Sequence, residues 1–328
     1  MKAIQITQQG DYDVLRPVEM PAPQLRGHEA LVRMTVAAVN ALDDQVRRGL
    51  LPMARPAPFV AGIEGVGVVE EPGDSGLKAG AGVMVWPYSR RFGITQDGTW
   101  AEYVVADPYN LVVVPSGICD SEVAGFLVAY VTAQLALTNA GGFQAGQTVL
   151  APAVGGSLGN AVLQLARAQG AARVITTAGT TPKAEQARAA GYEDVIDLSE
   201  EMLIHTVLEI TEGRGVDLVI DTVGGFITGS SLAALAPGGT LVAAGYRAGN
   251  WIDLDLQDLI RKSCHVVGMD LFSAPAEAIR QAVVTVRSLL AARQVRPLVA
   301  RAFPLQEAAA AQRFQIEERP FGKVLLTI

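Results

Sequence analysis

The stretch from Val149 to Ala171 constrains the fold of this chain more than any other. It begins with a short apolar run, Val149 to Ala153, that a sheet can bury on both faces. Three glycines follow, and then an apolar helix predicted to begin near Asn160; the glycines are Gly155, Gly156 and Gly159. Such a turn leaves the free N–H groups of the helix pointing out of the sheet, which suits a pyrophosphate. Because glycines between a strand and a helix are common, context must decide.

That context is an alternation of strand and helix patterns after Thr148. Six strands are predicted, at residues 148–153, 173–177, 194–196, 216–221, 240–245 and 265–269. The helices predicted between them lie at 160–169, 183–190, 199–212, 226–236 and 254–262. Right-handed βαβ units of this kind predict a parallel sheet, and six strands make two mononucleotide-binding halves. The glycine turn follows the first strand of that sheet.

The part of the chain before Pro115 has a different pattern. Alternating or β-branched runs predict strands at 3–6, 30–39, 65–70, 83–86 and 101–105, and proline and glycine clusters separate them. A largely antiparallel β domain is expected there. Residues 120–139 read as an apolar helix, and a helix at 275–294 leads into strand-like pieces at 299–303 and 323–328. These last pieces are expected to return to the first domain.

Composition narrows the class of protein. Half of the 328 residues are hydrophobic and 18% are charged, as in soluble globular enzymes. The formal net charge of −7 offers no basic surplus for nucleic acid. No apolar run has the length of a signal peptide core or a spanning helix, so we expect a cytoplasmic protein with no membrane partner. The two cysteines, Cys119 and Cys264, are expected to be buried free thiols.

Several motifs in fixed order make a family resemblance specific. They are VAAVNALDDQVRRG (36–49), PFVAGIEGVGVVE (58–70), GTWAEYVV (98–105), the glycine turn, VDLVIDTVGG (216–225) and FGKVLLTI (321–328). With them the chain resembles, nearly end to end, the medium-chain dehydrogenase/reductase superfamily in its zinc-free quinone oxidoreductase branch. The resemblance implies an α/β fold with a GroES-like, mostly antiparallel catalytic domain (1–118), a Rossmann domain with a doubly wound parallel sheet (119–270) and a return to the catalytic domain (271–328). It also implies an active site between the domains and a homodimer.

Zinc ligands of the family are missing. Zinc-dependent relatives carry a catalytic ligand in a GHE triplet, where this chain has Gly62, Ile63 and Glu64. The first-ligand cysteine is absent as well. The structural zinc lobe needs four cysteines and the chain has two, so no metal is expected.

The end of the second parallel strand indicates which nicotinamide cofactor is bound. An NAD site would place a carboxylate there for the ribose hydroxyls, but none occurs from Thr176 until Glu185. A 2′-phosphate needs donors and positive charge, which Thr180, Thr181 and Lys183 can supply. NADP(H) is therefore the expected cofactor. A solvated Lys183 with no phosphate contact is the alternative.

The resemblance implies further cofactor contacts. Thr132 matches a threonine beside the nicotinamide, and Arg319 resembles a basic residue that reaches the adenosine phosphate. The other implied contacts are Gly155, Gly156, Ser157, Leu158, Gly159, Thr177, Gly179, Thr180, Lys183, Val223, Gly245, Tyr246, Gly268, Met269 and Asp270. Three residues depart from the family pattern. Ser157 replaces a turn glycine, and Leu198 and Leu51 replace tyrosines on the adenosine and substrate sides.

The expected reaction follows from the missing metal ligands. Without a Lewis acid for an alkoxide, hydride transfer to a quinone or an α,β-unsaturated carbonyl is favoured, because charge delocalises onto an oxygen that a hydrogen bond can hold. Candidate catalytic residues are Asn40, Asp43 and Tyr88, and both Tyr88 and Trp86 are candidates for a pocket wall or a proton donor. Asn40 could equally be a helix N-cap, and Asp43 could lie in the first turn of that helix without a catalytic role.

Two other functions stay open. An enoyl-thioester reductase, acting on acyl-CoA or acyl-carrier protein, shares the fold and the hydride chemistry. A basic collar would favour it, and the candidates are Arg47, Arg48, Arg55, Arg90 and Arg91. The chain could also bind NADPH without turnover.

Overall fold

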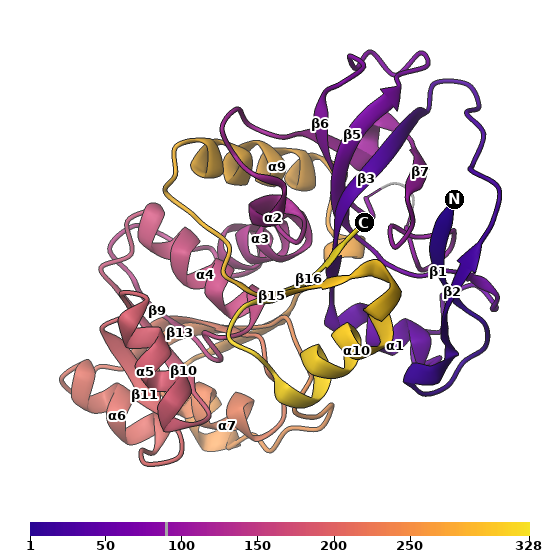
Figure 1. The fold of residues 1–328 in the computed structure, drawn as a ribbon. Coiled ribbons are helices and arrows are strands. Elements are labelled where there is room, and N and C mark those ends of the chain that lie inside the picture. Colours follow the sequence, from indigo (N-terminus) through magenta and orange to yellow (C-terminus); the bar gives the residue numbers. More distant parts are fainter. Residues whose placement is uncertain (89–90) are drawn as a thin grey trace. The chain divides into compact units, whose positions relative to one another are not determined.

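The structure of the chain is a computed structural model that describes residues 1–88 and 91–328 (Figure 1). It divides into two compact units. Unit 1 comprises Met1–Val128 and Pro297–Ile328, and unit 2 comprises Ala129–Arg296. Unit 2 thus extends beyond the expected boundary at 270. At its end, the Gln164 side chain accepts a hydrogen bond from the Arg296 N–H at 2.6 Å and donates one to the Arg296 carbonyl at 2.8 Å.

Unit 2 contains the six predicted parallel strands. They are β9 (Thr148–Ala151), β10 (Arg173–Ala178), β11 (Asp194–Asp197), β12 (Val216–Asp221), β13 (Leu235–Ala243) and β14 (His265–Gly268). Their order in the sheet is β11-β10-β9-β12-β13-β14, and every pairing is parallel. The direction of winding reverses between β9 and β12, so a topological switch point lies beside the glycine turn.

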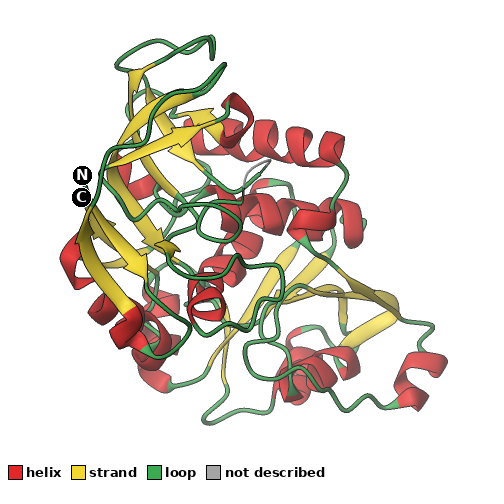
Figure 2. Ribbon diagram, turned by 90° about the vertical axis from the view of Figure 1, so that its right-hand side faces the viewer, coloured by secondary structure: helices red, strands yellow, loops and turns green. Residues whose placement is uncertain are grey.

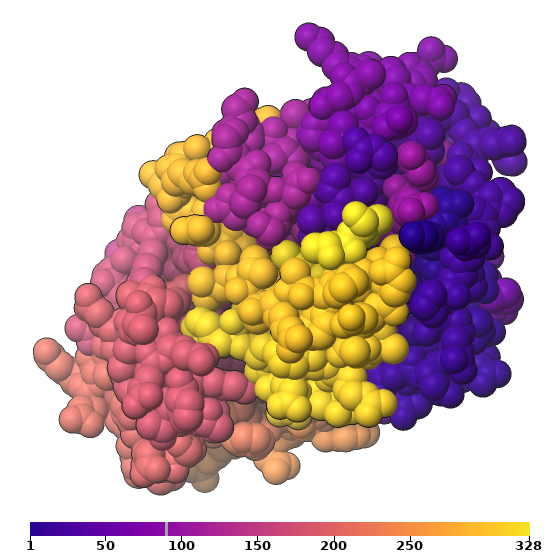
Figure 3. All heavy atoms as spheres, in the orientation of Figure 1, coloured from indigo at the N-terminus to yellow at the C-terminus, as the bar shows by residue number. Residues whose placement is uncertain are grey.

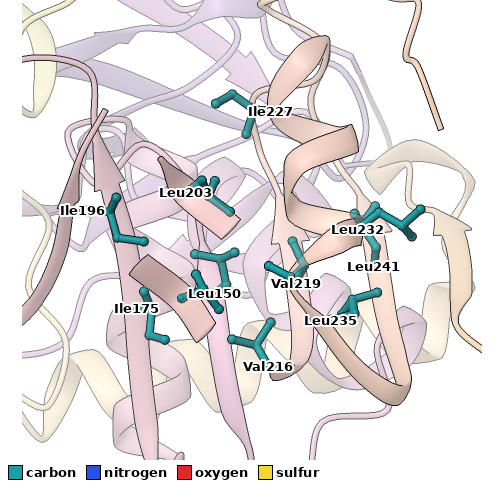
Figure 4. Close-up of a cluster of buried hydrophobic side chains, with 12 residues drawn as sticks. Leu150, Ile175, Ile196, Leu203, Val216, Val219, Ile227, Leu232, Leu235 and Leu241 are labelled. Atoms are coloured by element: carbon teal, nitrogen blue, oxygen red, sulfur yellow. The ribbon is translucent and has the colours of Figure 1, made fainter. Parts of the chain in front are cut away.

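Helices cover both faces of this sheet (Figure 2). They are α4 (Ser157–Ala168), α5 (Thr181–Ala189), α6 (Leu203–Ile210), α7 (Phe226–Ala233), α8 (Leu256–Arg261) and α9 (Ala276–Ala291). On one face, Leu203 of α6 and Ile227 of α7 pack with Leu150, Ile175 and Val219 of the strands (Figure 4). Right-handed crossovers place α4 and α5 on the other face. The sheet is therefore buried on both sides, as its apolar strands require.

Several element boundaries differ from those expected. The helix after β12 ends at Ala233, and β13 begins at Leu235, which pairs with Val216. Gly238 then adopts a φ of +75°, and pairing resumes at Thr240. Helix α4 begins at Ser157, one turn earlier than predicted. The serine that replaces a family glycine is thus the first residue of the helix.

Unit 1 is built on two sheets. Its strands are β1 (Lys2–Ile6), β2 (Leu15–Glu19), β3 (Ala30–Val39), β4 (Phe59–Val60), β5 (Gly65–Glu71), β6 (Gly82–Val85), β7 (Tyr103–Ala106), β8 (Leu111–Val113), β15 (Val299–Pro304) and β16 (Lys323–Thr327). A three-stranded sheet has the order β2-β1-β4, and a larger sheet has the order β15-β16-β3-β5-β6-β8, with β7 paired to β3. The expected antiparallel pattern holds except between β15 and β16, which are parallel.

The C-terminal segment completes unit 1. Strand β16 pairs antiparallel with β3, so Val324 lies opposite Val39. Helix α10 (Ala308–Arg313) follows β15. In Figure 3 the C-terminal residues, in yellow, lie next to the N-terminal residues, in indigo. This return was expected. It brings Lys323 to the end of β3, where helix α1 (Ala41–Arg47) begins.

The helical run Asp120–Ala140 contains α2 (Asp120–Val123) and α3 (Leu127–Leu135). Its length and apolar composition would allow it to span a membrane, but 72% of its most apolar window is buried, as in the core helix of a soluble protein. Both cysteines are free, but neither is fully buried: Cys119 is exposed and Cys264 is half-buried. The expectation of two buried thiols is therefore wrong.

The core of unit 2 can be tested by truncation. Replacing Val219, which is completely buried in the cluster of Figure 4, by Ala should lower the free energy of unfolding by about 1–3 kcal/mol, because two methyl groups leave a cavity. Val284→Ala, at a side chain 66% exposed on α9, is the matched control and should have little effect. Equal losses in chemical denaturation would contradict this assignment of the core.

Candidate functional site

The glycine turn after β9 is held in a fixed shape by β10. The Ala153 N–H donates to Thr177 Oγ1 at 3.1 Å, and the Val154 N–H donates to the Thr177 carbonyl at 3.2 Å. Ala153 itself has a φ of +63°, a backbone conformation that residues other than glycine rarely adopt. The expected cofactor residue Thr177 thus supports the turn from the neighbouring strand.

The turn has room for a phosphate because its glycines carry no side chains. A Cβ on Gly159 would lie 2.6 Å from the Ala153 carbonyl oxygen and 2.7 Å from that of Pro152, so only glycine lets α4 pack this close to β9. Gly156 is the N-cap of α4 and offers no capping side chain. The first N–H groups of an α-helix have no intrahelical partner, so those of α4 are available to an anion. The turn therefore fits the pyrophosphate of a dinucleotide.

The residues expected to bind a 2′-phosphate lie at the end of β10 and the start of α5. Thr180 is the N-cap of α5, but its hydroxyl makes no capping hydrogen bond, and the first turn of α5 contains no acidic residue. Lys183 is half-buried and has no ion-pair partner among the described residues. The Thr181 hydroxyl lies 3.3 Å from that of Ser199, which donates to Asp197 at 2.5 Å. These bonds tie the start of α5 to the end of β11.

The carboxyl ends of the other strands are tightly organised. Asp221, completely buried at the end of β12, accepts hydrogen bonds from the N–H groups of Val223 at 2.8 Å and Gly224 at 3.0 Å. A Cβ on Gly245 would lie 2.2 Å from the Thr222 carbonyl oxygen, so the loop after β13 needs glycine there. Because all six strands are parallel, the turns after β9, β10, β12, β13 and β14 lie along one edge of the sheet.

The structure therefore brings most of the expected cofactor residues to one edge of unit 2. Gly268, Met269 and Asp270 follow β14 there, but the Asp270 carboxylate accepts from Phe272 N–H and Ser273 Oγ within its own turn. Thr132 belongs to α3, away from the strand ends in sequence. Arg319 belongs to unit 1, where it ends a helical segment with a φ of +48°.

A second group of polar residues is buried inside unit 1. Asn40 is the N-cap of α1, and its N–H donates to Asp43 Oδ2 at 2.7 Å. Asn40 and Asp43 form the capping box of α1, and the Asn40 side-chain Oδ1 also accepts from Lys323 Nζ. Lys323 Nζ also lies 3.1 Å from Glu64 Oε1. Glu64 Oε2 in turn accepts from the Val128 N–H at 3.1 Å.

Sequence reasoning missed Lys323 and Glu64 as members of this group. Glu64 belongs to the altered triplet and Lys323 to the closing motif, but the sequence assigns neither a role. A charged residue within an apolar motif is common and does not by itself indicate a site. Their exposed fractions, 4% and 1%, mark them as unusual, because charged side chains are almost never buried unless paired.

Burial sets the protonation behaviour of Asp43. Desolvation raises the pKa of Asp43 from 3.8 to about 7, and the charge of Glu64 adds to this. The N–H groups of Asn40 and Ile63 and the Lys323 ammonium oppose the shift. Asp44 and Arg47 on the same helix form a separate pair at 2.5 Å.

Tyr88 lies apart from this group in its described contacts. Its ring stacks on Trp86, with centroids 5.4 Å apart and planes 7° apart, and its N–H donates to the Trp86 carbonyl at 3.0 Å. Trp86 is buried. No described contact joins Tyr88 to Asn40 or Asp43.

The structure does not support the basic collar. Arg47 is 2% exposed, and its guanidinium is bound by Asp44, Gln312 and the Gly10 carbonyl. Arg48 lies 3.5 Å from Asp44, and Arg55 lies 3.6 Å from Asp97. Arg91 donates to Met53 Sδ at 3.2 Å, and Arg90 lies outside the described residues. Among the described candidates, Arg47 is buried, and Arg48 and Arg55 each lie beside a carboxylate.

Metal-ligating side chains do not gather in the part of the chain that the structure describes. No group of three or more His, Cys, Asp or Glu residues able to hold a metal ion occurs there. Ile63 is completely buried in the altered triplet, and Asn40 and Glu64 use their oxygens to bind Lys323.

Comparisons with known proteins agree with this arrangement. Residues 26–116 match the family described as alcohol dehydrogenase GroES-like domain, and residues 157–287 match the family described as zinc-binding dehydrogenase. The human quinone oxidoreductase is 25% identical over 332 residues, covering 100% of this chain and 98% of that protein. The structure of a mycobacterial quinone oxidoreductase is 30% identical over the full length of both chains, with a TM-score of 0.85. An NAD-dependent alcohol dehydrogenase is 28% identical over both full lengths, with a TM-score of 0.89.

The protonation of Asp43 gives a test that needs no ligand. Its folded-state pKa near 7 exceeds the ordinary value of 3.8, so the folded chain binds the extra proton and loses stability as pH rises from about 4 to 7. One pKa unit corresponds to about 1.4 kcal/mol. Asp43→Asn should therefore show a flatter dependence of unfolding free energy on pH than the wild type. Asp74→Asn, at an exposed turn, should keep the wild-type slope; parallel curves for all three proteins would refute the assignment.

Proposed function

We propose that this chain, which belongs to the quinone oxidoreductase branch of the medium-chain dehydrogenase/reductase superfamily, transfers hydride from NADPH to a quinone or an α,β-unsaturated carbonyl compound. Members of this superfamily are NAD(P)-dependent oxidoreductases with the GroES-like and Rossmann-like units described above. The observation that carries the choice of cofactor is the start of α5, where Thr180 and Lys183 face no carboxylate in the first turn. A phosphate on the adenosine ribose needs such donors and would be repelled by an acid.

Each unit has its own set of residues suited to the proposed activity. The N–H groups of α4 and the side chains at the start of α5 would bind the phosphates of the cofactor. The cofactor supplies the hydride when it is bound. The buried group of Asn40, Asp43 and Lys323 offers a neutral amide and a carboxyl that can hold a proton near pH 7. Such groups suit an acceptor whose developing charge is spread over a conjugated system.

The proposed reaction is tested by following the loss of NADPH absorbance with three acceptors in parallel. We expect consumption with a small quinone or with an enone. Consumption only with a crotonyl thioester would identify an enoyl-thioester reductase instead. NADPH binding, measured by calorimetry, without consumption of any of the three would show a binding protein and reject the proposal.

The phosphate assignment is tested by Lys183→Glu. A charge-assisted bond to the 2′-phosphate is worth about 1.5–3 kcal/mol, so the variant should bind NADPH roughly 10–100-fold more weakly while its affinity for NADH changes little. Lys78→Glu, at an exposed position in unit 1, makes the same change of charge and serves as the control. If Lys183→Glu weakens both cofactors equally in titration calorimetry, the assignment of the 2′-phosphate to this position is incorrect.

We also propose that the chain forms a homodimer through the edge of the unit 2 sheet. Strand β14 is the last strand of that sheet and is largely exposed. Apolar side chains of β14, of α8 and of the segment before α8 are exposed: Val266, Ile260 and Trp251 are 42%, 66% and 93% exposed. An unpaired strand edge bordered by apolar surface favours pairing with an identical edge.

The dimer is tested by Val266→Lys, which places a charge on the unpaired strand. We expect a shift from dimer to monomer in sedimentation equilibrium, with Val284→Lys on α9 as the exposed control. A wild-type chain that sediments as a monomer would rule the dimer out.

A further inference from the structure

We propose that Lys323 is a positioning residue that fixes the side-chain amide of Asn40, so that Asn40 Nδ2 donates a hydrogen bond to the carbonyl oxygen of the hydride acceptor. In this arrangement Glu64 holds Lys323 in place. The inference rests on the proposed function and deepens it, because it names the donor atom and the residues that aim it.

The orientation of the amide follows from the chemistry of its partner. An ammonium group has three donors and no acceptor, so the atom of Asn40 that contacts Lys323 Nζ must be the oxygen, Oδ1. The nitrogen, Nδ2, therefore points away from Lys323. It has no hydrogen-bond partner among the described residues, although Asn40 is only 9% exposed.

A buried donor without a partner is costly. Leaving one unsatisfied costs about 1–3 kcal/mol, and native chains avoid it unless a ligand or a function compensates. Rotating the amide would not help, because it would set Nδ2 against the Lys323 ammonium. An acceptor atom brought by a ligand would satisfy Nδ2, and a carbonyl oxygen is the acceptor that both substrate classes carry.

The surroundings leave Lys323 little freedom to move. A Cβ on Gly125 would lie 2.3 Å from Lys323 Cε, so α2 and α3 are joined by a glycine that presses against the lysine stem. Glu64 binds the ammonium at 3.1 Å and is itself held by the Val128 N–H. The ion pair is neutral overall and almost completely buried. It can therefore hold a dipole in a fixed direction without presenting a charge to the ligand.

The Asn40 amide would act during the reduction of the conjugated C=C bond. Hydride adds to the β-carbon of the α,β-unsaturated carbonyl, the C=C electrons move toward the oxygen, and an enolate forms. The Asn40 amide stabilises the enolate oxygen by a hydrogen bond and transfers no proton. A proton from solvent then adds to the α-carbon, which yields the saturated carbonyl and the oxidised cofactor.

A purely structural ion pair is the competing explanation. Lys323 joins β16 to the segment before β5 through Glu64, and such a pair could exist only to connect them. The two explanations differ in what a bound carbonyl would report. A structural pair affects stability alone, whereas a positioning residue also changes the hydrogen bond at the carbonyl oxygen.

The test uses the whole chain and two readouts, turnover and the infrared carbonyl frequency of a bound saturated ketone analogue. Asn40→Asp keeps the contact with Lys323 but removes both amide donors; we expect turnover to fall about 10²–10³-fold, as for loss of one oxyanion donor, and the carbonyl frequency to move to its unbound value. NADPH affinity should be unchanged.

The positioning role is tested by a double variant, Lys323→Met with Glu64→Gln, which removes both charges so that neither is left buried alone. We expect the double variant to fold, to lose at least about tenfold in turnover and to show a broadened or shifted carbonyl band. The single variant Lys323→Arg keeps a positive charge, and its band should lie closer to that of the wild type than the band of the double variant does. Arg33→Met, which breaks the exposed pair with Glu70, is the control and should change neither readout.

The proposed function and the role of Asn40 are tested by different results. If the wild type consumes no NADPH with any acceptor, the proposed function is rejected, and the carbonyl band of the bound analogue still tests the role of Asn40. A wild-type analogue band equal to that of Asn40→Asp, or no binding of the analogue at all, overturns the inference. Normal bands and turnover in the double variant, with lowered stability only, assign Lys323 and Glu64 a structural role.

Discussion

Parallel strands impose the constraint on which the rest of unit 2 depends. Because β9 to β14 all run in one direction, their carboxyl ends meet along one edge, and the turns that follow them must share that edge. The reversal between β9 and β12 keeps the adjacent helices on opposite faces, which leaves a crevice for a ligand. The glycine at position 159 and the buried Asp221 then shape the turns on either side of it.

Unit 1 depends on a different physical balance. It buries an ammonium group, a glutamate and an aspartate in its core, and a buried charge is tolerated only when it is paired or neutralised. Lys323 and Glu64 neutralise each other, and Asp43 adapts by holding its proton up to about pH 7. The cost of burying such a group is high, so its position beside the start of α1 calls for an explanation beyond packing.

The sequence was sufficient for what depends on local pattern. Apolar strands alternating with helices predicted all six strands of unit 2, and the glycine turn predicted the loop that Thr177 now supports. Contacts between distant residues could not be predicted in this way. Lys323 reaches Asn40 across 283 positions of sequence, and no periodicity signals that pairing. The same limit explains Arg47, a candidate for the basic collar, which is buried against Gln312.

The buried ion pair also bears on which acceptors the chain could reduce. An alkoxide concentrates a full charge on one oxygen and needs a cation or a metal ion beside it, whereas Lys323 is already neutralised by Glu64. What remains available at the start of α1 is the neutral amide nitrogen of Asn40. A neutral donor is best matched to an oxygen that carries only part of the developing charge, as in an enolate or a reduced quinone. This match between a neutralised lysine and a delocalised acceptor links the packing of unit 1 to the reaction proposed for the chain.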